Sequence, residues 1–346
     1  MRKTEEISLS LHTKHVTKTV LSNRISYKRA FIGDTCAAYH YTSPEGLMGI
    51  LKNREIFFTD AEFLNDASER KNINEDLNRF WARCKKDYEE RFIRVLSDIR
   101  VNAYEDYRFG TIDKAYKGKA CRYFVLSASK DSDSLSMWKY YAKNGSYNGY
   151  NIGLDTLALQ DTWINREQGI AIEYGSVIYE DDEKYYQIKE AVNHIYESWI
   201  QYEYSDKLDE KIRGEFETWV SLNSLFFKHE SFSTEEEYRY VAVVPTENIK
   251  ILSYTTENGS NVQMYNFRAV DGVLTPYIKV PIWGTDDLDL KATFWNVASI
   301  GIAPCLNFEL KKNGVIQFVK SLPYRVENFQ INKSKIPVRY KQITGL

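Results

Sequence analysis

Three separated groups of side chains in this sequence are of types that bind or transform ligands. The first is His40, Tyr41 and Thr42, which end a short strand pattern directly before Ser43 and Pro44. A hydroxyl that caps free amides, followed by proline, is a typical helix start. The imidazole is therefore expected at a strand end facing a helix N-terminus, which attracts anions such as phosphate. The competing interpretation is a packed histidine whose ring nitrogens bond to the backbone.

The second group is Ser127 and Ser129 at the end of the pattern CRYFVLSAS, with Trp138 and Tyr141 on the predicted helix that follows. Strand alternation directs the two serines to one side, and helical spacing places the two rings along one face. Such a slot suits a flat ring, which a tyrosine or tryptophan stacks on while serine hydroxyls fix a ribose or an amide. Alternatively, the serines only end a strand and cap a helix.

The third group is Glu235, Glu237 and Arg239, which are expected to alternate on one face at the start of the strand pattern EEEYRYVAVV. Two carboxylates and a guanidinium beside an apolar strand cost solvation free energy unless they pair with each other or meet a ligand. The alternative is a solvated strand entry whose charges form an exposed ladder.

A mixed scaffold must position these groups. Apolar periodicity predicts helices around Leu47 to Leu51, twice between 66 and 117, after Ser134, and twice between 182 and 227, the last pair forming a lid or flank. The predicted strands lie around His40 and at 56–58, 121–129, 147–155, 174–181, 235–244 and 298–304. Asn-Gly and Asp-Gly pairs predict turns, and the stretch near Gly314 fits a helix or a strand. Because no βαβ rhythm repeats, the expected class is α+β.

Composition excludes several classes of protein. The 46 basic and 48 acidic residues nearly cancel, so no global field recruits nucleic acid or an anionic membrane. The four cysteines lie far apart with no CxxC pair, which argues against a zinc site and against a disulfide framework. No run approaches the roughly 20 apolar residues that cross a bilayer, and the first residues lack the apolar core of a signal peptide. We therefore expect a cytoplasmic protein without a membrane partner.

The order of the three groups resembles that of the ADP-ribosyltransferase-like superfamily, in which a histidine strand, a serine-bearing strand and a later ExE strand follow one another. The chain also looks like the bacterial family known as domain of unknown function twenty-nine seventy-one. This second resemblance spans about residues 38 to 305. It is carried by HYT at 40–42, LND at 64–66, SMW at 136–138 with Tyr141, Phe232 through Glu235, Glu237 and Arg239, and IGIAP at 300–304.

The resemblance implies a split β-sheet core with flanking helices, in a single domain over residues 31–330. A helical insertion would occupy about 182–228. Residues 1–30 would form a basic N-terminal arm, and residues 331–346 a basic C-terminal tail.

The resemblance also implies an activity: cleavage of NAD at the nicotinamide glycosidic bond, with NAD as substrate and no metal. Glu237 would stabilise the oxocarbenium-like ribose, and Glu235 would engage the acceptor. The cofactor-binding residues would be His40, which donates a hydrogen bond to a ribose, with Tyr41 and Thr42; Ser127 and Ser129, which line the pocket; Trp138 or Tyr141, which walls the ring; and Arg239, which pairs with Glu237 or a phosphate.

The identity of the acceptor stays open. Protein, nucleic acid or a small molecule could accept ADP-ribose, and water as the acceptor would make the enzyme an NAD glycohydrolase. Either activity fits a toxin or an anti-phage defence effector. The mixed histidine, SxS and ExE set departs from the usual superfamily patterns, which leaves the subclass undecided. The alternative of another class is an inactive module of the same fold, which binds a nucleotide in the aromatic slot or a regulatory protein through residues 182–227.

Overall fold

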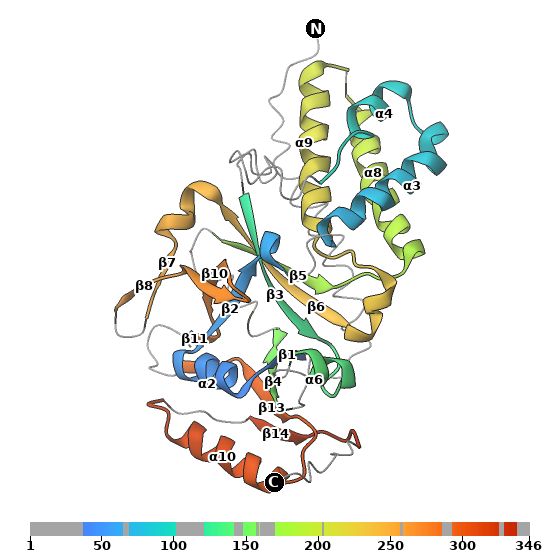
Figure 1. The fold of residues 1–346 in the computed structure, drawn as a ribbon. Helices are drawn as coiled ribbons and strands as arrows, with labels where there is room; N and C mark the ends of the chain where they lie inside the picture. The colour runs from blue at the N-terminus through green and yellow to red at the C-terminus, as the bar shows by residue number, and fades with distance from the viewer. Residues whose placement is uncertain are drawn as a thin grey trace.

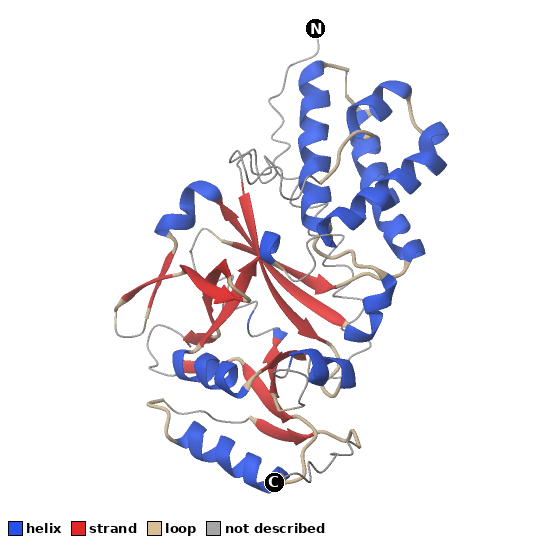
Figure 2. Cartoon of the chain, viewed as in Figure 1, coloured by secondary structure: helices blue, strands red, loops and turns tan. Residues whose placement is uncertain are grey.

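The computed structural model describes residues 37–64, 69–101, 121–141, 148–156, 159, 170–202, 204–256, 259–285, 293–324 and 329–337. The predicted arm at 1–30, Asn65 and Asp66 of the LND motif, and the tail beyond 337 lie outside these residues. The described chain is mixed α+β. Strands gather in the middle of the molecule and a group of helices lies to one side of them (Figure 2).

The main sheet has ten strands in the described part of the chain. Their order is β14-β13-β4-β1-β3-β2-β10-β9, with β6 pairing β3 and β5 pairing β6 (Figure 1). All of these pairs are antiparallel except β13 with β14. The strands are β1 (Ala37–Thr42), β2 (Glu55–Asp60), β3 (Cys121–Ser129), β4 (Tyr150–Asp155), β5 (Ala171–Ser176), β6 (Glu237–Pro245), β9 (Tyr265–Val270), β10 (Val273–Pro281), β13 (Val297–Ile302) and β14 (Gln330–Lys333).

The sheet forks at β3. One edge of β3 pairs with β6 along its whole length, from Cys121 opposite Pro245 to Ser129 opposite Glu237. The other edge meets two strands: β2 near Val125 and β1 at Ser129. Residues 126–128 therefore have no strand partner on that edge, and β1 and β2 diverge there.

Helix α2 (Pro44–Asn53) joins the two branches of the fork. Ser43 caps it, since its hydroxyl accepts the Gly46 N–H, and Pro44 occupies the first turn, as the sequence predicts. Leu47 and Leu51 are buried in the main core, with Phe124, Leu126 and Tyr240 among the strand residues that they join. The predicted strand–helix–strand unit is thus confirmed.

The helical group consists of α3 (Asn72–Cys84), α4 (Glu90–Leu96), α8 (Asp181–Trp199) and α9 (Asp206–Asn223). It has its own apolar core, separate from that of the sheet, which includes Phe80, Phe92, Trp199 and Phe216. The two helices predicted at 182–227 are α8 and α9, and they pack against α3 and α4 to form a flanking bundle. The bundle lies at the opposite end of the molecule from β14 and α10 (Phe308–Lys320) (Figure 1).

Several smaller expectations are settled. The stretch near Gly314 is the helix α10. The Asp-Gly pair makes the tight turn between β9 and β10, where Asp271 and Gly272 both have positive φ, as a type I′ hairpin requires. The strand predicted at 174–181 is displaced, since β5 ends at Ser176 and Val177 and Tyr179 follow it. Short hairpins join β7 (Ser253–Thr255) to β8 (Asn261–Gln263) and β11 (Trp283–Thr285) to β12 (Thr293–Trp295). Within the described ranges, no helix combines the length and the apolar character that membrane crossing requires.

Candidate functional site

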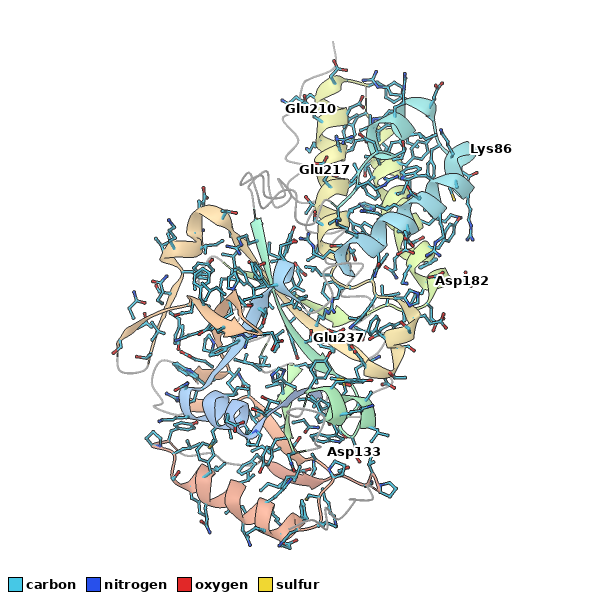
Figure 3. The ribbon with its side chains drawn as sticks, in the orientation of Figure 1. Lys86, Asp133, Asp182, Glu210, Glu217 and Glu237 are labelled. Atoms are coloured by element: carbon cyan, nitrogen blue, oxygen red, sulfur yellow. The ribbon has the colours of Figure 1, made fainter. Side chains whose placement is uncertain are left out.

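A pocket of about 460 Å³ lies at the fork of the sheet. Its walls come from β1, α2 and β2, from β3 and β6, and from β9 and β10. Eight of the ten predicted site residues line it: His40, Tyr41, Thr42, Ser127, Tyr141, Glu235, Glu237 and Arg239. Ser129 and Trp138 do not. Glu237 lies near the centre of the molecule, whereas Glu210 and Lys86 mark the outer part of the helical bundle (Figure 3).

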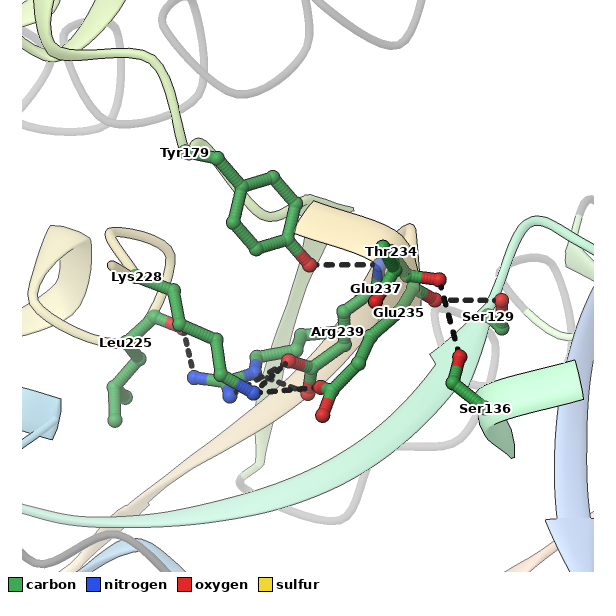
Figure 4. Close-up of polar contacts among 9 residues, drawn as sticks. All are labelled: Ser129, Ser136, Tyr179, Leu225, Lys228, Thr234, Glu235, Glu237 and Arg239. Atoms are coloured by element: carbon green, nitrogen blue, oxygen red, sulfur yellow. Dashed lines mark hydrogen bonds and ion pairs between the residues drawn. The ribbon is translucent and has the colours of Figure 1, made fainter. Parts of the chain in front are cut away.

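Glu237 begins β6 and is 3% exposed. The Arg239 guanidinium holds its carboxylate with two bonds, Nε to Oε1 at 2.7 Å and Nη2 to Oε2 at 2.9 Å (Figure 4). Because the side chains of residues two apart on a strand share a face, the spacing Glu-x-Arg allows this two-bond ion pair. Arg239 also donates Nη1 to the carbonyl of Leu225 at 2.6 Å. Of the two roles expected for Arg239, the structure shows the pairing with Glu237.

Lys228 links the two glutamates. Its ammonium lies 2.7 Å from Glu235 Oε2 and 3.1 Å from Glu237 Oε2, and its side chain is buried (Figure 4). The ammonium also lies 4.7 Å from the centre of the Phe232 ring. The cluster thus joins two carboxylates to two cations, which is the arrangement that buried charges need.

Glu235 reaches the cluster from outside the strand, which corrects the expected strand alternation. It ends a short 3-10 helix, η4 (Glu230–Glu235), and Glu236 then takes a left-handed conformation with φ 42° before β6 begins. This turn, rather than a two-residue strand repeat, brings Glu235 beside Glu237. Among the described residues, the hydrogen bond from Lys228 is the one that the Glu235 carboxylate accepts, and it uses Oε2.

The charges around Glu237 set its protonation state. Burial is the largest single influence and raises the pKa of Glu237, whereas the charges of Arg239 and Lys228 lower it. Hydrogen bonds from Arg239 and from the Ser127 side chain act in the same direction, and together they lower the pKa to about 2. Glu237 is therefore ionised at any physiological pH, which suits a fixed negative charge and not a general base.

His40 takes its orientation from the fork. The Lys130 N–H donates to the carbonyl of Glu236, so even-numbered residues of β3 bond to β6 and odd-numbered residues turn their backbone groups to the other edge. The carbonyl of Ser127 points that way and meets His40 Nδ1 at 3.0 Å. A carbonyl oxygen only accepts, so Nδ1 carries the hydrogen. Burial lowers the pKa of His40, so the neutral ring offers Nε2 as an acceptor. The donor role expected for His40 is thereby corrected.

Tyr41 lines the pocket, and Trp138 packs behind it. The Tyr41 hydroxyl donates to the carbonyl of Asp131 and accepts the Ser134 N–H, so it fixes the loop before α6 (Leu135–Tyr141). Its ring packs edge-on against Trp138, with centroids 4.6 Å apart. Trp138 is 1% exposed and donates its indole N–H to Asp133, so it is a core residue and does not wall the pocket.

Ser129 also has a structural role in place of the expected contact with a ligand. Its hydroxyl donates to the carbonyl of Glu235 at 2.7 Å and accepts the Asp131 N–H at 3.1 Å. Ser129 thereby ties the turn that carries Glu235 to the end of β3. The interpretation of the serines as strand-ending groups holds for Ser129, whereas Ser127 lines the pocket.

Tyr141 is the aromatic residue of α6 that lines the pocket, and it is 38% exposed. Burial of its hydroxyl, with the charges of Glu235 and Glu237 nearby, raises the pKa of Tyr141 to about 12. The phenol therefore stays neutral beside the two carboxylates. Of the two candidates for a ring-stacking side chain, the geometry favours Tyr141 over Trp138.

Sequence reasoning missed three residues of the site: Lys228, Tyr179 and Arg268. Tyr179 accepts the Glu237 N–H with its hydroxyl at 3.0 Å, and Arg268 on β9 lines the pocket. None of them belongs to a motif that the sequence singles out. The available signal was weak: Lys228 follows the apolar run LFF, in a place where a lysine needs a partner if it is buried.

In the described residues, no group of three histidine, cysteine, aspartate or glutamate side chains could hold a metal ion. The pocket combines apolar wall residues with a neutral imidazole acceptor, a neutral phenol and two neighbouring carboxylates that Lys228 and Arg239 hold. Such a set can bind a polar ligand that has hydroxyl groups and a flat ring, and it can stabilise a positive charge that develops beside Glu235 and Glu237.

Comparison with known families finds one match. Residues 137–240 are similar to the family described as Protein of unknown function (DUF2971). The matched stretch contains Tyr141, Lys228, Glu235, Glu237 and Arg239, whereas His40 and Ser127 precede it. No curated protein and no solved structure matches the chain. These comparisons do not support the resemblance to the ADP-ribosyltransferase-like superfamily, which stays a prediction.

Proposed function

We propose that this protein consumes NAD, breaking the bond between nicotinamide and ribose and passing ADP-ribose to an acceptor or to water. One observation carries the proposal: His40, Ser127, Tyr141, Glu235 and Glu237, which the chain spreads over nearly two hundred residues, line the same pocket. The pocket volume of about 460 Å³ falls within the range of roughly 300–1,000 Å³ typical of ligand sites.

The proposed chemistry is a displacement at the ribose carbon C1. The glycosidic bond breaks, and its electron pair leaves with the pyridinium nitrogen, so that nicotinamide departs neutral. The ribose then carries oxocarbenium-like positive charge, which the permanently ionised Glu237 stabilises. An acceptor hydroxyl or a water molecule adds to C1, and its proton passes to Glu235 or to solvent.

The remaining residues would position the ligand. His40 Nε2 accepts a hydrogen bond from a ribose hydroxyl, because Nδ1 is already bonded to Ser127. Tyr141 provides an aromatic wall for the nicotinamide ring. Glu235, with one oxygen bonded to Lys228, directs the incoming nucleophile with the other oxygen. Lys228 and Arg239 keep the two carboxylates at their places.

A second candidate function is ligand binding without turnover. One observation favours it: both oxygens of Glu237 already accept hydrogen bonds, from Arg239 and from Lys228. A carboxylate held in this way has little capacity left for a substrate hydroxyl. In this alternative the cluster is a structural ion-pair network below a nucleotide-binding pocket.

The test is the release of nicotinamide from NAD by the purified full-length chain, alone and with cell lysate that supplies acceptors. We expect wild-type protein to release nicotinamide and Glu237→Gln to lose at least about a hundredfold in rate, the size typical of a lost electrostatic group. Glu236→Gln is the matched control, since it makes the same chemical change at an adjacent, exposed residue that does not line the pocket.

Circular dichroism checks that each variant is folded. If wild-type protein binds NAD but releases no nicotinamide under any of these conditions, the binding module replaces the enzyme. Equal rates for Glu237→Gln and Glu236→Gln would remove Glu237 from the reaction.

A further inference from the structure

Arg268 lies on the β2–β10–β9 branch of the fork, whereas the glutamates come from the β6 side, on the other edge of β3. Arg268 belongs to β9, pairs across the hairpin with Thr275 of β10, and lines the pocket together with Val270 and Thr275. The β2–β10–β9 branch thus brings a guanidinium to the pocket, while Glu235 and Glu237 come from the β6 side. No part of the proposed reaction uses this arginine.

Arg268 is exposed, and three contacts orient its guanidinium toward β2 and β10. Its Nη2 donates to the hydroxyl of Thr59 on β2 at 2.8 Å. The guanidinium carbon lies 5.9 Å from the centre of the Phe57 ring and 5.6 Å from that of Tyr277. Such ring contacts fix a planar cation without neutralising it. The Arg268 side chain would therefore lose little conformational entropy when a ligand binds to it.

The charge of Arg268 is uncompensated within the described parts of the chain. Of the three cations that line the pocket, Lys228 and Arg239 are paired with carboxylates. Arg268 makes one hydroxyl bond and two ring contacts, with no ion pair among the described residues. Burial lowers the pKa of Arg268, yet a guanidinium stays charged in a protein. A fixed, unpaired positive charge beside a pocket attracts an anion.

We infer that Arg268 is an anion subsite that binds the diphosphate of a nucleotide in the fork pocket. The guanidinium presents a planar set of donors that matches phosphate oxygens better than an ammonium does. This inference rests on the proposed function for the identity of the ligand, because in NAD the diphosphate is separated from the glycosidic bond by one ribose. It assigns the β6 side of the pocket to the glycosidic bond and the β9 side to the diphosphate of one molecule.

The test measures binding of ADP and of adenosine to the full chain by calorimetry, without any turnover. Wild-type protein binds ADP at least about tenfold more tightly than adenosine, as expected for charge-assisted hydrogen bonds. Arg268→Gln removes this difference and leaves adenosine affinity unchanged. Arg268→Lys, which keeps the charge but not the planar donors, retains part of it. Arg91→Gln removes a positive charge from the helical bundle and changes neither affinity.

Three results overturn the subsite: wild-type protein that fails to bind ADP, equal affinities for ADP and adenosine, or unchanged ADP affinity in both Arg268 variants. These results are distinct from failure of the proposed function. If the protein turns over NAD but its ADP affinity is the same with and without Arg268, the proposed reaction is supported and the subsite is wrong. If ADP binding depends on Arg268 but NAD is not turned over, the subsite is supported and the proposed reaction is wrong.

Discussion

The Nδ1 atom of His40 lies 3.0 Å from the carbonyl oxygen of Ser127, a residue 87 positions later in the chain. The contact exists because β1 and β2 diverge from the same edge of β3, which leaves that carbonyl without a strand partner. The ring fills the place of the missing backbone donor. A gap in the sheet thus creates the pocket and also fixes the histidine that lines it.

The tautomer of His40 follows from this contact. We expect His40 to carry its hydrogen on Nδ1 at neutral pH and to titrate below the ordinary histidine pKa, because burial disfavours the charged ring. His229 is an internal control with the opposite tautomer, since its Nδ1 accepts the Ser231 N–H and leaves the hydrogen to Nε2. Nitrogen-15 NMR of the two rings distinguishes the forms. A hydrogen on Nε2 of His40 would contradict the proposed acceptor role.

The ionisation of Glu237 predicts a specific acid dependence of stability. The pKa of Glu237 is lowered to about 2 in the folded protein, against about 4.3 for an unperturbed glutamate. Its contribution is therefore complete above about pH 4.3 and is lost as the pH falls toward 2. Glu237→Gln should be less stable by about 3–5 kcal/mol near neutral pH, because Arg239 and Lys228 lose a charged partner.

This difference in unfolding free energy should stay constant above about pH 4.3 and shrink below it. Urea unfolding of both proteins between pH 3 and pH 7 measures it, and other acidic groups cancel because both proteins contain them. A difference that does not vary with pH would show that Glu237 is not held ionised by its neighbours.

Lys228 should be energetically coupled to Glu235. A cycle of Lys228→Met, Glu235→Gln and the double variant should give a coupling energy of about 0.5–3 kcal/mol, since the pair is 2.7 Å apart and largely buried. The control cycle is Arg213→Met with Glu217→Gln, an ion pair on α9 with both side chains 36% exposed. Exposed helical pairs of this kind contribute about 0.3–0.5 kcal/mol. Equal coupling in the two cycles would argue that Lys228 does not organise the cluster.

Two glycines of α2 that line the pocket should respond oppositely to alanine. A Cβ at Gly46 would collide with Oγ1 of Thr42, whereas a Cβ at Gly49 would meet no atom within 4 Å. Gly49→Ala should raise stability by up to about 1 kcal/mol through helix propensity. Gly46→Ala should lower it and displace Thr42 from the pocket wall. Thermal unfolding measures the stability of both variants. Adding Thr42→Ala to Gly46→Ala should restore the lost stability, because the colliding oxygen is then absent. If Gly46→Ala is as stable as Gly49→Ala, the contact between Gly46 and Thr42 does not require a glycine.

The main elements around the site were predictable because they depend on local patterns. The Ser43 cap, Pro44 and the spacing of Leu47 and Leu51 specify α2, and the apolar run at 121–129 specifies β3. Glu235 was misplaced because one left-handed residue, Glu236, interrupts the alternation that a strand would have had. Trp138 was misassigned because helical spacing predicts which face of the helix a side chain lies on, but not what packs against that face.

The sequence by itself determined the α+β class, most of the helices and strands around the site, and that Glu237 and Arg239 share a face, because spacing along one strand or helix sets which side chains lie together. It left open whether Arg239 pairs with Glu237 or with a phosphate. Only the tertiary structure decided that the sheet forks at β3, that Lys228 joins the two glutamates, and that Arg268 faces the same pocket. These contacts join residues from separate elements. They depend on strand order and register, which the pairing of whole strands fixes and no local pattern encodes.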